Sequence, residues 1–489
     1  MPDLETQGRR YENTALIVVL IGVMMTAVDT TAVVLGLPVM MVDLSSDMIS
    51  MIWVIMAYLL MITIFGTQVG RLGDMYGRVR LYNVGFAVFT SASLLCGFAQ
   101  NGSQLIGFRI LQGLGGAMVF SNSGAIIADT VSLERRGRAY GLAGVGYSLG
   151  AIAGILLGGV IITFLSWRYI FFINVPLGIA AVVVSYKVLR ERSPKLKRRI
   201  DYPGMALMGV GLLLVLYALT QMTGSGWTAL IGIEILAGFL LLISFAVWEK
   251  VYSDPLLDLS LLSQRVLTAS ILAAFFQAIA SFAVLFLVIM YLQGVRGLSP
   301  LDASLVLVPG YLLGGLISPF SGRMSDRLGA RYVATLGLAL QAVGILVYSS
   351  LTADSAFWIV VVGAVINGSG SNFFFPANSS AVMSSAPRQS YGIASGLLRT
   401  FSNVGMVSSF ALALLVASLA ISRQLAFQIF LGVNRLSGSL LSAYVSGMHE
   451  ALLVSIGLLL VAAALSVLRG KEARTSMQQT RSQDSAGTR

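Results

Sequence analysis

The chain has 489 residues, of which 56% are hydrophobic and only 11% charged, and its formal net charge is +11. Soluble globular proteins carry about 25% charged residues, so this composition and a mean hydropathy of +0.85 exclude a large soluble fold. The positive charge does not indicate a nucleic-acid partner, because the basic residues lie in short loops between apolar runs and not on one soluble face.

Apolar runs of membrane-spanning length follow one another along the chain. The first run is too long for the core of a signal peptide and lacks a small-residue cleavage site, so we interpret it as a spanning helix. We therefore expect an all-α integral membrane protein with about fourteen spanning helices. They are predicted at residues 14–37, 49–69, 81–100, 104–128, 138–165, 168–190, 203–222, 229–249, 266–293, 301–321, 331–352, 356–385, 391–419 and 449–468.

The distribution of basic residues predicts the orientation. Most of the 32 Lys and Arg residues fall in one set of loops and tails, and the opposite set holds only Arg168, Arg296, Arg423 and Arg435. Because cytoplasmic loops are enriched in Lys and Arg, both termini are expected to be cytoplasmic in a multi-pass protein of the cell membrane. The basic run before the seventh span is interpreted as part of this topology signal, with an anionic-lipid site as the alternative.

Short motifs recur about 250 residues apart, which predicts two homologous six-helix halves. The helix pair between the halves has no counterpart in the repeat. The predicted division is a cytoplasmic tail at 1–13, a first bundle at 14–190, a basic linker at 191–202, an inserted hairpin at 203–250, an interfacial linker at 251–265, a second bundle at 266–469 with an outer loop at 420–447, and a disordered cytoplasmic tail at 470–489.

A charged, glycine-containing loop joins the second and third spans and recurs in the second half. A gating role is predicted for its residues Gly70, Asp74, Gly77 and Arg78, and for Asp326 in the second copy. Asp74 is expected to cap or pair with the inner start of the helix that begins near Tyr391.

Arg78 is expected to pair with Asp129, at the inner end of the fourth span, so that the loop latches the two halves in an outward-open state. A positive-inside retention signal is the alternative. It explains Arg71 and Arg80 but not the acid that both copies share.

Asp29 is a carboxylate inside the first predicted span. A charged side chain at the bilayer centre costs about 2.5–3.5 kcal/mol on insertion scales, and desolvation favours the protonated form of a carboxyl group. These properties suit a group that takes up and releases protons. The alternative is a polar residue satisfied by helix packing.

Arg109 lies inside the fourth span, and Gln112 follows it one turn later. A nearby arginine favours the ionised form of a carboxylate, so Arg109 is predicted to drive proton release from Asp29 when the two approach. The alternative is a structural arginine bonded to backbone carbonyls.

Small and polar residues in other spans predict packing surfaces and a cavity. Gly146, Gly150 and Gly154 recur every four residues on the fifth span, which favours close helix approach and a gating role. Polar and aromatic residues at membrane depth usually face a cavity. The residues predicted to line the substrate cavity are Tyr58, Gln112, Tyr147, Asn372, Phe373, Arg399 and Asn403.

Signals of soluble enzymes are missing from the sequence. The single Cys96 and the single histidine exclude a disulfide framework and multi-residue Cys or His metal sites. A phosphate-binding loop that ends in Gly-Lys-Ser/Thr is also missing, so no ATPase motor is expected in this chain. We predict neither an enzyme nor a bound cofactor.

The motifs quoted above resemble the major facilitator superfamily. Gly70–Arg80 is similar to its loop signature between helices two and three, and Arg109–Ala117 to its fourth-helix signature. Asp29–Pro38 resembles the first-helix signature of the fourteen-helix drug:proton antiporters of the EmrB/QacA type. Trp53–Leu60 and Trp167–Pro176 are also similar to that group.

Two departures from the group bear on coupling and substrate. The fifth-helix antiporter signature has Pro where this chain has Ala151, which weakens antiport relative to other coupling modes. Cation exporters of this type carry further acids in the second half, whereas here that half carries Arg399. A neutral, lipophilic or anionic substrate is therefore more plausible than for a typical cation exporter.

The resemblance implies a monomeric transporter in which two six-helix bundles rock around a central site, driven by the proton gradient, with small molecules, protons and membrane lipids as partners. The leading hypothesis is proton-coupled export of small amphipathic or lipophilic compounds, that is, multidrug efflux. One alternative is an exporter or flippase of lipids or organic anions. Another is a non-transporting receptor, for which the short polar tail offers no output domain.

Overall fold

The computed structural model describes residues 2–131, 133–191, 199–386, 391–420 and 438–470. Every regular element in these ranges is helical, which confirms the predicted all-α class. The helices of the first half are α1 Pro2–Asp43, α2 Met48–Tyr76, α3 Arg78–Gly97, α4 Gly102–Thr130, α5 Leu133–Phe164, α6 Tyr169–Phe172 and α7 Asn174–Val188.

The inserted pair and the second half follow in order. Their helices are α8 Tyr202–Ser225, α9 Ala229–Val251, the 3-10 helix η1 Leu259–Ser263, α10 Arg265–Met290, the π-helical turn η2 Tyr291–Val295, α11 Pro300–Leu328, α12 Ala330–Tyr348, α13 Phe357–Ser385, α14 Tyr391–Ala420 and α16 Gly438–Leu468.

Thirteen helical segments of the described residues are long and apolar enough to cross a membrane. The helix α14 is a further long helix, of 30 residues, packed among them. Most predicted spans lie within a few residues of an observed helix. Two helices extend beyond their predicted spans: α1 begins at Pro2, within residues 1–13, and α16 begins at Gly438, within residues 420–447.

Polar side chains at the helix starts satisfy backbone donors that the helices leave open. Asp47 accepts a hydrogen bond from Ser50 N at 2.7 Å, and Asn101 accepts one from Gln104 N at 2.9 Å. Thr228 caps α9 in the same way. Because lipid offers no hydrogen bonds, such caps define where each span can begin.

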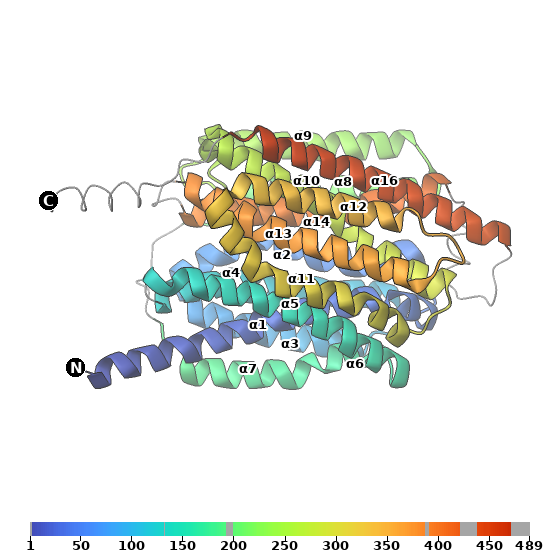
Figure 1. Cartoon of the computed structure of the whole chain (residues 1–489). Helices are drawn as coiled ribbons and strands as arrows, with labels where there is room; N and C mark the ends of the chain where they lie inside the picture. The colour runs from blue at the N-terminus through green and yellow to red at the C-terminus, as the bar shows by residue number, and fades with distance from the viewer. Residues whose placement is uncertain (1, 132, 192–198, 387–390, 421–437, 471–489) are drawn as a thin grey trace.

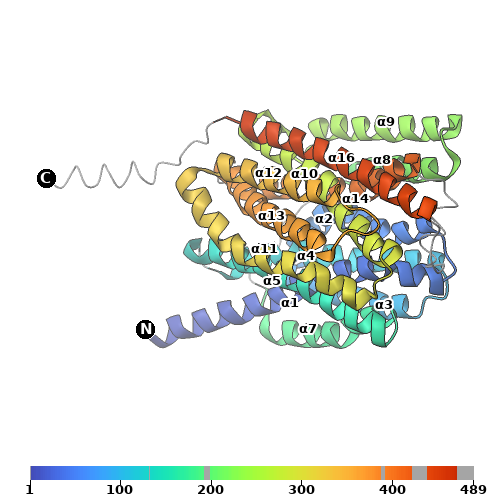
Figure 2. The same ribbon diagram turned by 45° about the vertical axis from the view of Figure 1, so that its right-hand side comes forward.

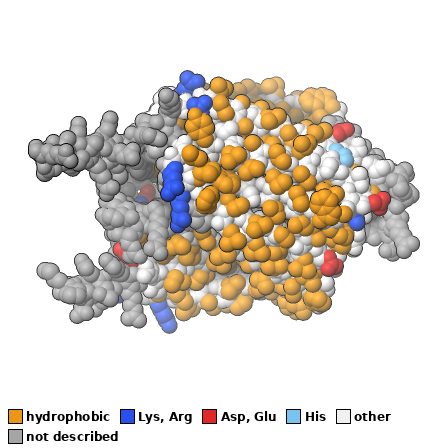
Figure 3. All heavy atoms as spheres, in the orientation of Figure 1, with side chains coloured by type: hydrophobic (Ala, Val, Ile, Leu, Met, Phe, Trp, Pro, Cys, Tyr) orange, Lys and Arg blue, Asp and Glu red, His pale blue; other side chains and the backbone are white. Residues whose placement is uncertain are grey.

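The helices run side by side in one bundle, with the start of α1 and the end of α16 at the same end (Figures 1 and 2). We call this end the terminal face. Hydrophobic side chains cover the middle of the visible side of the bundle, and charged side chains appear toward its two ends (Figure 3). A lipid bilayer has the same order of apolar core and polar boundaries.

The inserted pair lies at the edge of the bundle. The helices α8 and α9 pack against each other, and α8 also packs against α2 and α14. Most of α9 is exposed: the apolar side chains Leu236, Phe239 and Ile243 each expose more than half of their surface. In a membrane this row faces lipid.

The predicted glycine stripe of α5 packs against α1, within the first half. A Cβ atom built on Gly150 would lie 2.7 Å from Met24 O, and one on Gly154 would lie 2.6 Å from Val28 O. Thr31 donates from α1 to Ala151 O at this contact. Gly159, five residues beyond Gly154, lies against Ser304 on α11 in the second half. A gating role for Gly146, Gly150 and Gly154 therefore stays a prediction.

We expect Gly154→Ala to lower the free energy of unfolding by about 1–3 kcal/mol, because its methyl group meets backbone that cannot move alone. Gly107→Ala is the control, since a Cβ at Gly107 on α4 meets nothing within 4 Å. Thermal unfolding of both variants in detergent checks this. Equal melting temperatures for Gly154→Ala and the wild type would contradict the tight α1–α5 contact.

Candidate functional site

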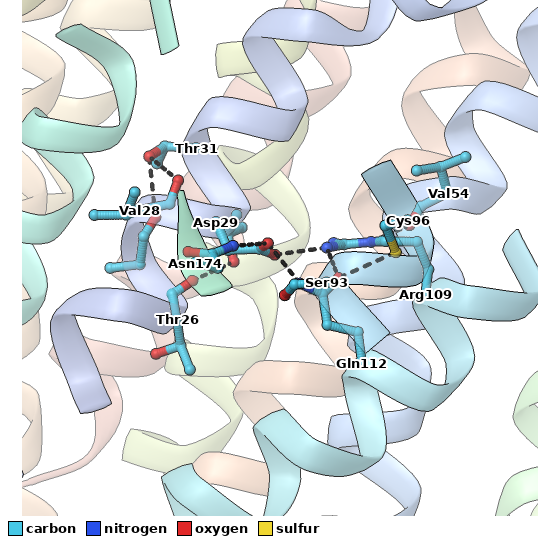
Figure 4. A network of polar contacts seen from close by, with 12 residues as sticks. Thr26, Val28, Asp29, Thr31, Val54, Ser93, Cys96, Arg109, Gln112 and Asn174 are labelled. Atoms are coloured by element: carbon cyan, nitrogen blue, oxygen red, sulfur yellow. Dashed lines mark hydrogen bonds and ion pairs between the residues drawn. The ribbon is translucent and has the colours of Figure 1, made fainter. Parts of the chain in front are cut away.

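A buried ion pair lies between α1 and α4. Asp29 is 1% exposed and Arg109 is 0% exposed. Arg109 donates from Nη1 to Asp29 Oδ2 at 2.5 Å, and the two side chains point toward each other in Figure 4. Thus the structure brings together the two residues predicted for proton coupling, although they are 80 positions apart.

Two amides complete the surroundings of Asp29. Gln112 Nε2 donates to Asp29 Oδ1 at 2.8 Å, and Asn174 Nδ2 donates to the same oxygen at 3.1 Å. With Arg109 on Oδ2, both carboxylate oxygens accept hydrogen bonds. This donor set matches an ionised carboxylate, which only accepts.

A second ring of contacts holds Gln112 in place. Its Oε1 accepts from Arg109 at 2.6 Å, and Cys96 Sγ lies 3.8 Å from the same oxygen. Its Nε2 also donates to Ser93 Oγ at 2.7 Å. The residues around the pair thus come from α1, α3, α4 and α7.

Sequence reasoning did not select Asn174, Ser93 or Cys96 as site residues. Asn174 is 0% exposed, and it lies in the Trp167–Pro176 stretch already noted for its resemblance. A buried amide in an apolar span was the signal that could have identified it, because such a group needs a partner.

Two residues of α2 also hold Arg109. Its Nε donates to Val54 O at 3.0 Å on α2, and its guanidinium lies 4.1 Å from the centre of the Tyr58 ring. Its Nη2 is buried without a hydrogen-bond partner among the described residues. Arg109 therefore bonds to a backbone carbonyl, as the structural alternative expected, and also to the acid.

The predicted cavity residues lie in separate places. Tyr58 and Gln112 belong to the Asp29 network, and Tyr147 lies near Tyr58 and Tyr311. The contacts of the described residues do not join the other members of the set to Asp29. These are Asn372, Phe373, Arg399 and Asn403.

Arg399 makes a contact between the two halves. Its guanidinium, on α14, lies 4.9 Å from the centre of the Phe120 ring on α4. By contrast, Asn372 donates to Gly368 O within its own helix. A cavity role for these two residues stays a prediction.

The second half carries an uncharged counterpart of the Asp29 network. The repeat spacing that relates Gly70 to Gly322 relates Asp29 to Ser281. Ser281 Oγ donates to Gln341 Oε1 at 2.9 Å, and Gln277 donates to the same oxygen at 2.8 Å. Two amides and a hydroxyl thus meet there without a titratable group, while Gln277 Oε1 and Gln341 Nε2 are buried without a partner among the described residues.

The predicted pairing of Arg78 with Asp129 is present at the terminal face. Arg78 Nη1 lies 2.6 Å from Asp129 Oδ1, and Nη2 lies 2.7 Å from Asp74 Oδ1. The predicted contact of Asp74 with the start of α14, near Tyr391, involves side chains that lie outside the described residues, so it stays a prediction. In the second copy, Ala330 stands where the first has Arg78, and the side chain of Asp326 is also outside that set.

Glu191 caps α3, which the sequence did not reveal. Its carboxylate accepts from the backbone N–H groups of Arg78 at 2.9 Å and Val79 at 3.1 Å. Gly77, between α2 and α3, has φ +113°, and a Cβ there would lie 2.6 Å from Glu191 Oε2. The glycine is thus required by its backbone conformation, whereas the exposed Glu191 side chain can move away from a Cβ.

Arg71, for which the sequence suggested only a topology signal, makes several contacts in the structure. It donates to the carbonyl oxygens of Arg199 and Pro255, and to Asp254 O at 2.7 Å. It also lies 3.7 Å from the Asp254 carboxylate. Arg71 thereby ties the end of α2 to the segment that follows α9.

Comparisons with known proteins were made for the whole chain. A family model described as Major Facilitator Superfamily matches residues 19–410 and 270–485. The riboflavin transporter RibZ of Clostridioides difficile is 30% identical over 454 residues, which cover 92% of this chain and 96% of RibZ. The multidrug transporter protein MdtP of Bacillus subtilis is 28% identical, with 82% of this chain and 75% of MdtP covered.

The tetracenomycin C resistance and export protein of Streptomyces glaucescens is 29% identical, with 80% of this chain and 73% of that protein covered. Among solved structures, a D-xylose-proton symporter superposes with a TM-score of 0.66 at 13% identity, covering 95% of this chain and 99% of that one. A bacterial homolog of the human lysosomal transporter Spinster superposes with a TM-score of 0.66 at 16% sequence identity. The match covers 94% of this chain and 97% of that one. At these identities the structural matches support the fold alone.

The buried pair predicts a coupled stability effect. Asp29→Ala and Arg109→Ala should each lower the free energy of unfolding by about 3–5 kcal/mol, because each leaves the opposite charge buried without its partner. The double variant should lose less than the sum, since neither charge remains. Thermal unfolding of the purified protein measures all three. Strictly additive losses would contradict direct coupling.

Proposed function

Because the chain belongs to the major facilitator superfamily of membrane transporters, and is not an enzyme, we propose that it is a proton-coupled exporter of small amphipathic or lipophilic compounds. The observation that carries the proposal is the buried contact between Asp29 and Arg109. A carboxylate this far from water is costly unless it is paired or protonated. It can therefore alternate between binding Arg109 and binding a proton.

The proposed cycle follows from that competition. With Asp29 ionised, Arg109, Gln112 and Asn174 hold the carboxylate. A proton that reaches Asp29 from outside removes the negative charge and weakens the hold on Arg109. As the halves rock and the site opens inward, Arg109 returns to Asp29 and displaces the proton. Substrate leaves by alternating access while the proton enters.

Relatives support export of organic compounds. Two of them are named for multidrug transport and for tetracenomycin C resistance and export, and a third for riboflavin transport. The inserted pair α8–α9 supports assignment to the fourteen-helix group of the EmrB/QacA type. We place the terminal face in the cytoplasm and the protein, as a monomer, in the cell membrane.

Export or flipping of lipids or organic anions is the alternative. Arg399, which contacts Phe120 across the two halves, favours it because a cation at that place attracts anionic groups. Competition between a lipid and a cationic dye for binding to the purified protein separates the two functions.

The first test is substrate accumulation in everted membrane vesicles whose interior is acidified. We expect the wild type to accumulate an amphipathic dye and Asp29→Asn to lose this gradient-driven accumulation, because an amide cannot carry the proton. Glu234→Gln, which removes an acid of the inserted helix α9, is the matched control and should keep activity. Full accumulation by Asp29→Asn would refute the proton-site assignment.

The second test concerns the two copies of the loop. Asp74→Asn should impair transport more than Asp326→Asn, because Asp74 binds Arg78 and the second copy has Ala330 at the matching position. Initial transport rates of both variants, normalised to protein in the membrane, measure the difference. Equal losses would contradict the asymmetry.

A further inference from the structure

Two buried carboxyl groups meet where the inserted pair reaches the terminal face. Asp201 immediately precedes α8, and Glu249 lies in the last turn of α9. Asp201 is 0% exposed and Glu249 is 3% exposed. Neither belongs to the Asp29 network or to the motifs that indicated a transporter.

Each carboxyl group has one satisfied oxygen. Asp201 Oδ1 accepts from Gly204 N and from Trp248 Nε1, both at 2.9 Å. Glu249 Oε2 accepts from Leu257 N at 2.7 Å. The remaining oxygens, Asp201 Oδ2 and Glu249 Oε1, are buried without a partner among the described residues.

The two unpartnered oxygens lie beside the same glycine, Gly204. A Cβ built on Gly204 would lie 3.0 Å from Glu249 Oε1 and closer still to Asp201 Oδ2, so both oxygens border the same small space. One proton placed between them would satisfy both oxygens, because it would be bonded to one oxygen and donated as a hydrogen bond to the other.

The surrounding charges do not neutralise two carboxylates. Arg71 on α2 acts on Glu249, but its guanidinium already binds the carbonyls of Asp254 and Pro255 and lies near the Asp254 carboxylate. Lys250 is exposed. Two adjacent buried carboxyl groups with no cation of their own resist double ionisation.

We propose that Asp201 and Glu249 form a proton-binding site at the terminal face, in which the two carboxyl groups share a single proton. The proton is the ligand that completes the two unpartnered oxygens. The site joins α8, α9 and the segment that follows α9, since Leu257 donates to one of its members.

Proton release from this pair acts on the contact between the inserted hairpin and the last turns of α2. Gln68 donates to Asp201 O at 3.2 Å, and Arg71 binds the segment that contains Asp254 and Pro255. A second negative charge on the pair attracts Arg71 and repels Asp254. Through these contacts, the pH at the terminal face changes how tightly the inserted hairpin packs against α2.

Infrared difference spectroscopy of the full-length protein in lipid nanodiscs tests the shared proton, with the proton as the only probe. On titration from acid to alkaline pH, the wild type should lose a C=O stretch that belongs to the carboxyl group holding the shared proton. Glu249→Gln should show no such band, because it lacks the pair. Asp201→Asn should lack it too, because Glu249 beside a neutral amide and Arg71 ionises. Identical titrations in the wild type and both variants would overturn the proposal.

Glu234→Gln is the matched control, since it removes the other acid of the inserted pair and should keep the band. Asp29 is present in all four proteins, so a failed transport proposal leaves this test unaffected.

Thermal unfolding gives a second readout. The folded pair holds a proton that the unfolded chain releases, so stability should fall as pH rises through the range of release. This fall should be smaller in Glu249→Gln, and an unchanged pH dependence would count against the site.

Discussion

The contact between Asp29 and Arg109 is the interaction on which the centre of the first half depends. Each charge alone would be strongly destabilising at membrane depth, so each residue needs the other and further hydrogen-bond partners around it. Gln112 and Asn174 fill the remaining acceptor positions of the carboxylate, and Val54 O holds the guanidinium. Four helices are thus positioned by the need to satisfy one ion pair.

The two halves share a repeat but not its electrostatics. Ser281 stands where the repeat places Asp29, and it bonds to Gln341 in a network without charge. A neutral network can stay dry and unchanged through a transport cycle, whereas a carboxylate responds to protons. The asymmetry concentrates the proposed proton coupling in the first half.

The terminal face depends on a different constraint, which is the satisfaction of polar groups where helices leave the apolar layer. Glu191 caps α3, Arg78 joins Asp74 to Asp129, and Arg71 binds carbonyls beyond α9. These contacts connect segments that are far apart in sequence. The repeated loop is therefore also the place where the inserted hairpin attaches to the first half.

The sequence by itself determined the class, the number of long helices and the residues Asp29 and Arg109, because apolar length and charges within spans are local properties of the chain. It also indicated the pairing of Arg78 with Asp129. The tertiary structure alone decided the partners that come from distant segments: Asn174 on Asp29, Glu191 on α3, and Asp201 against Glu249. Hydrogen bonds between separate helices depend on how the helices pack and rotate, and hydrophobic periodicity does not specify that geometry.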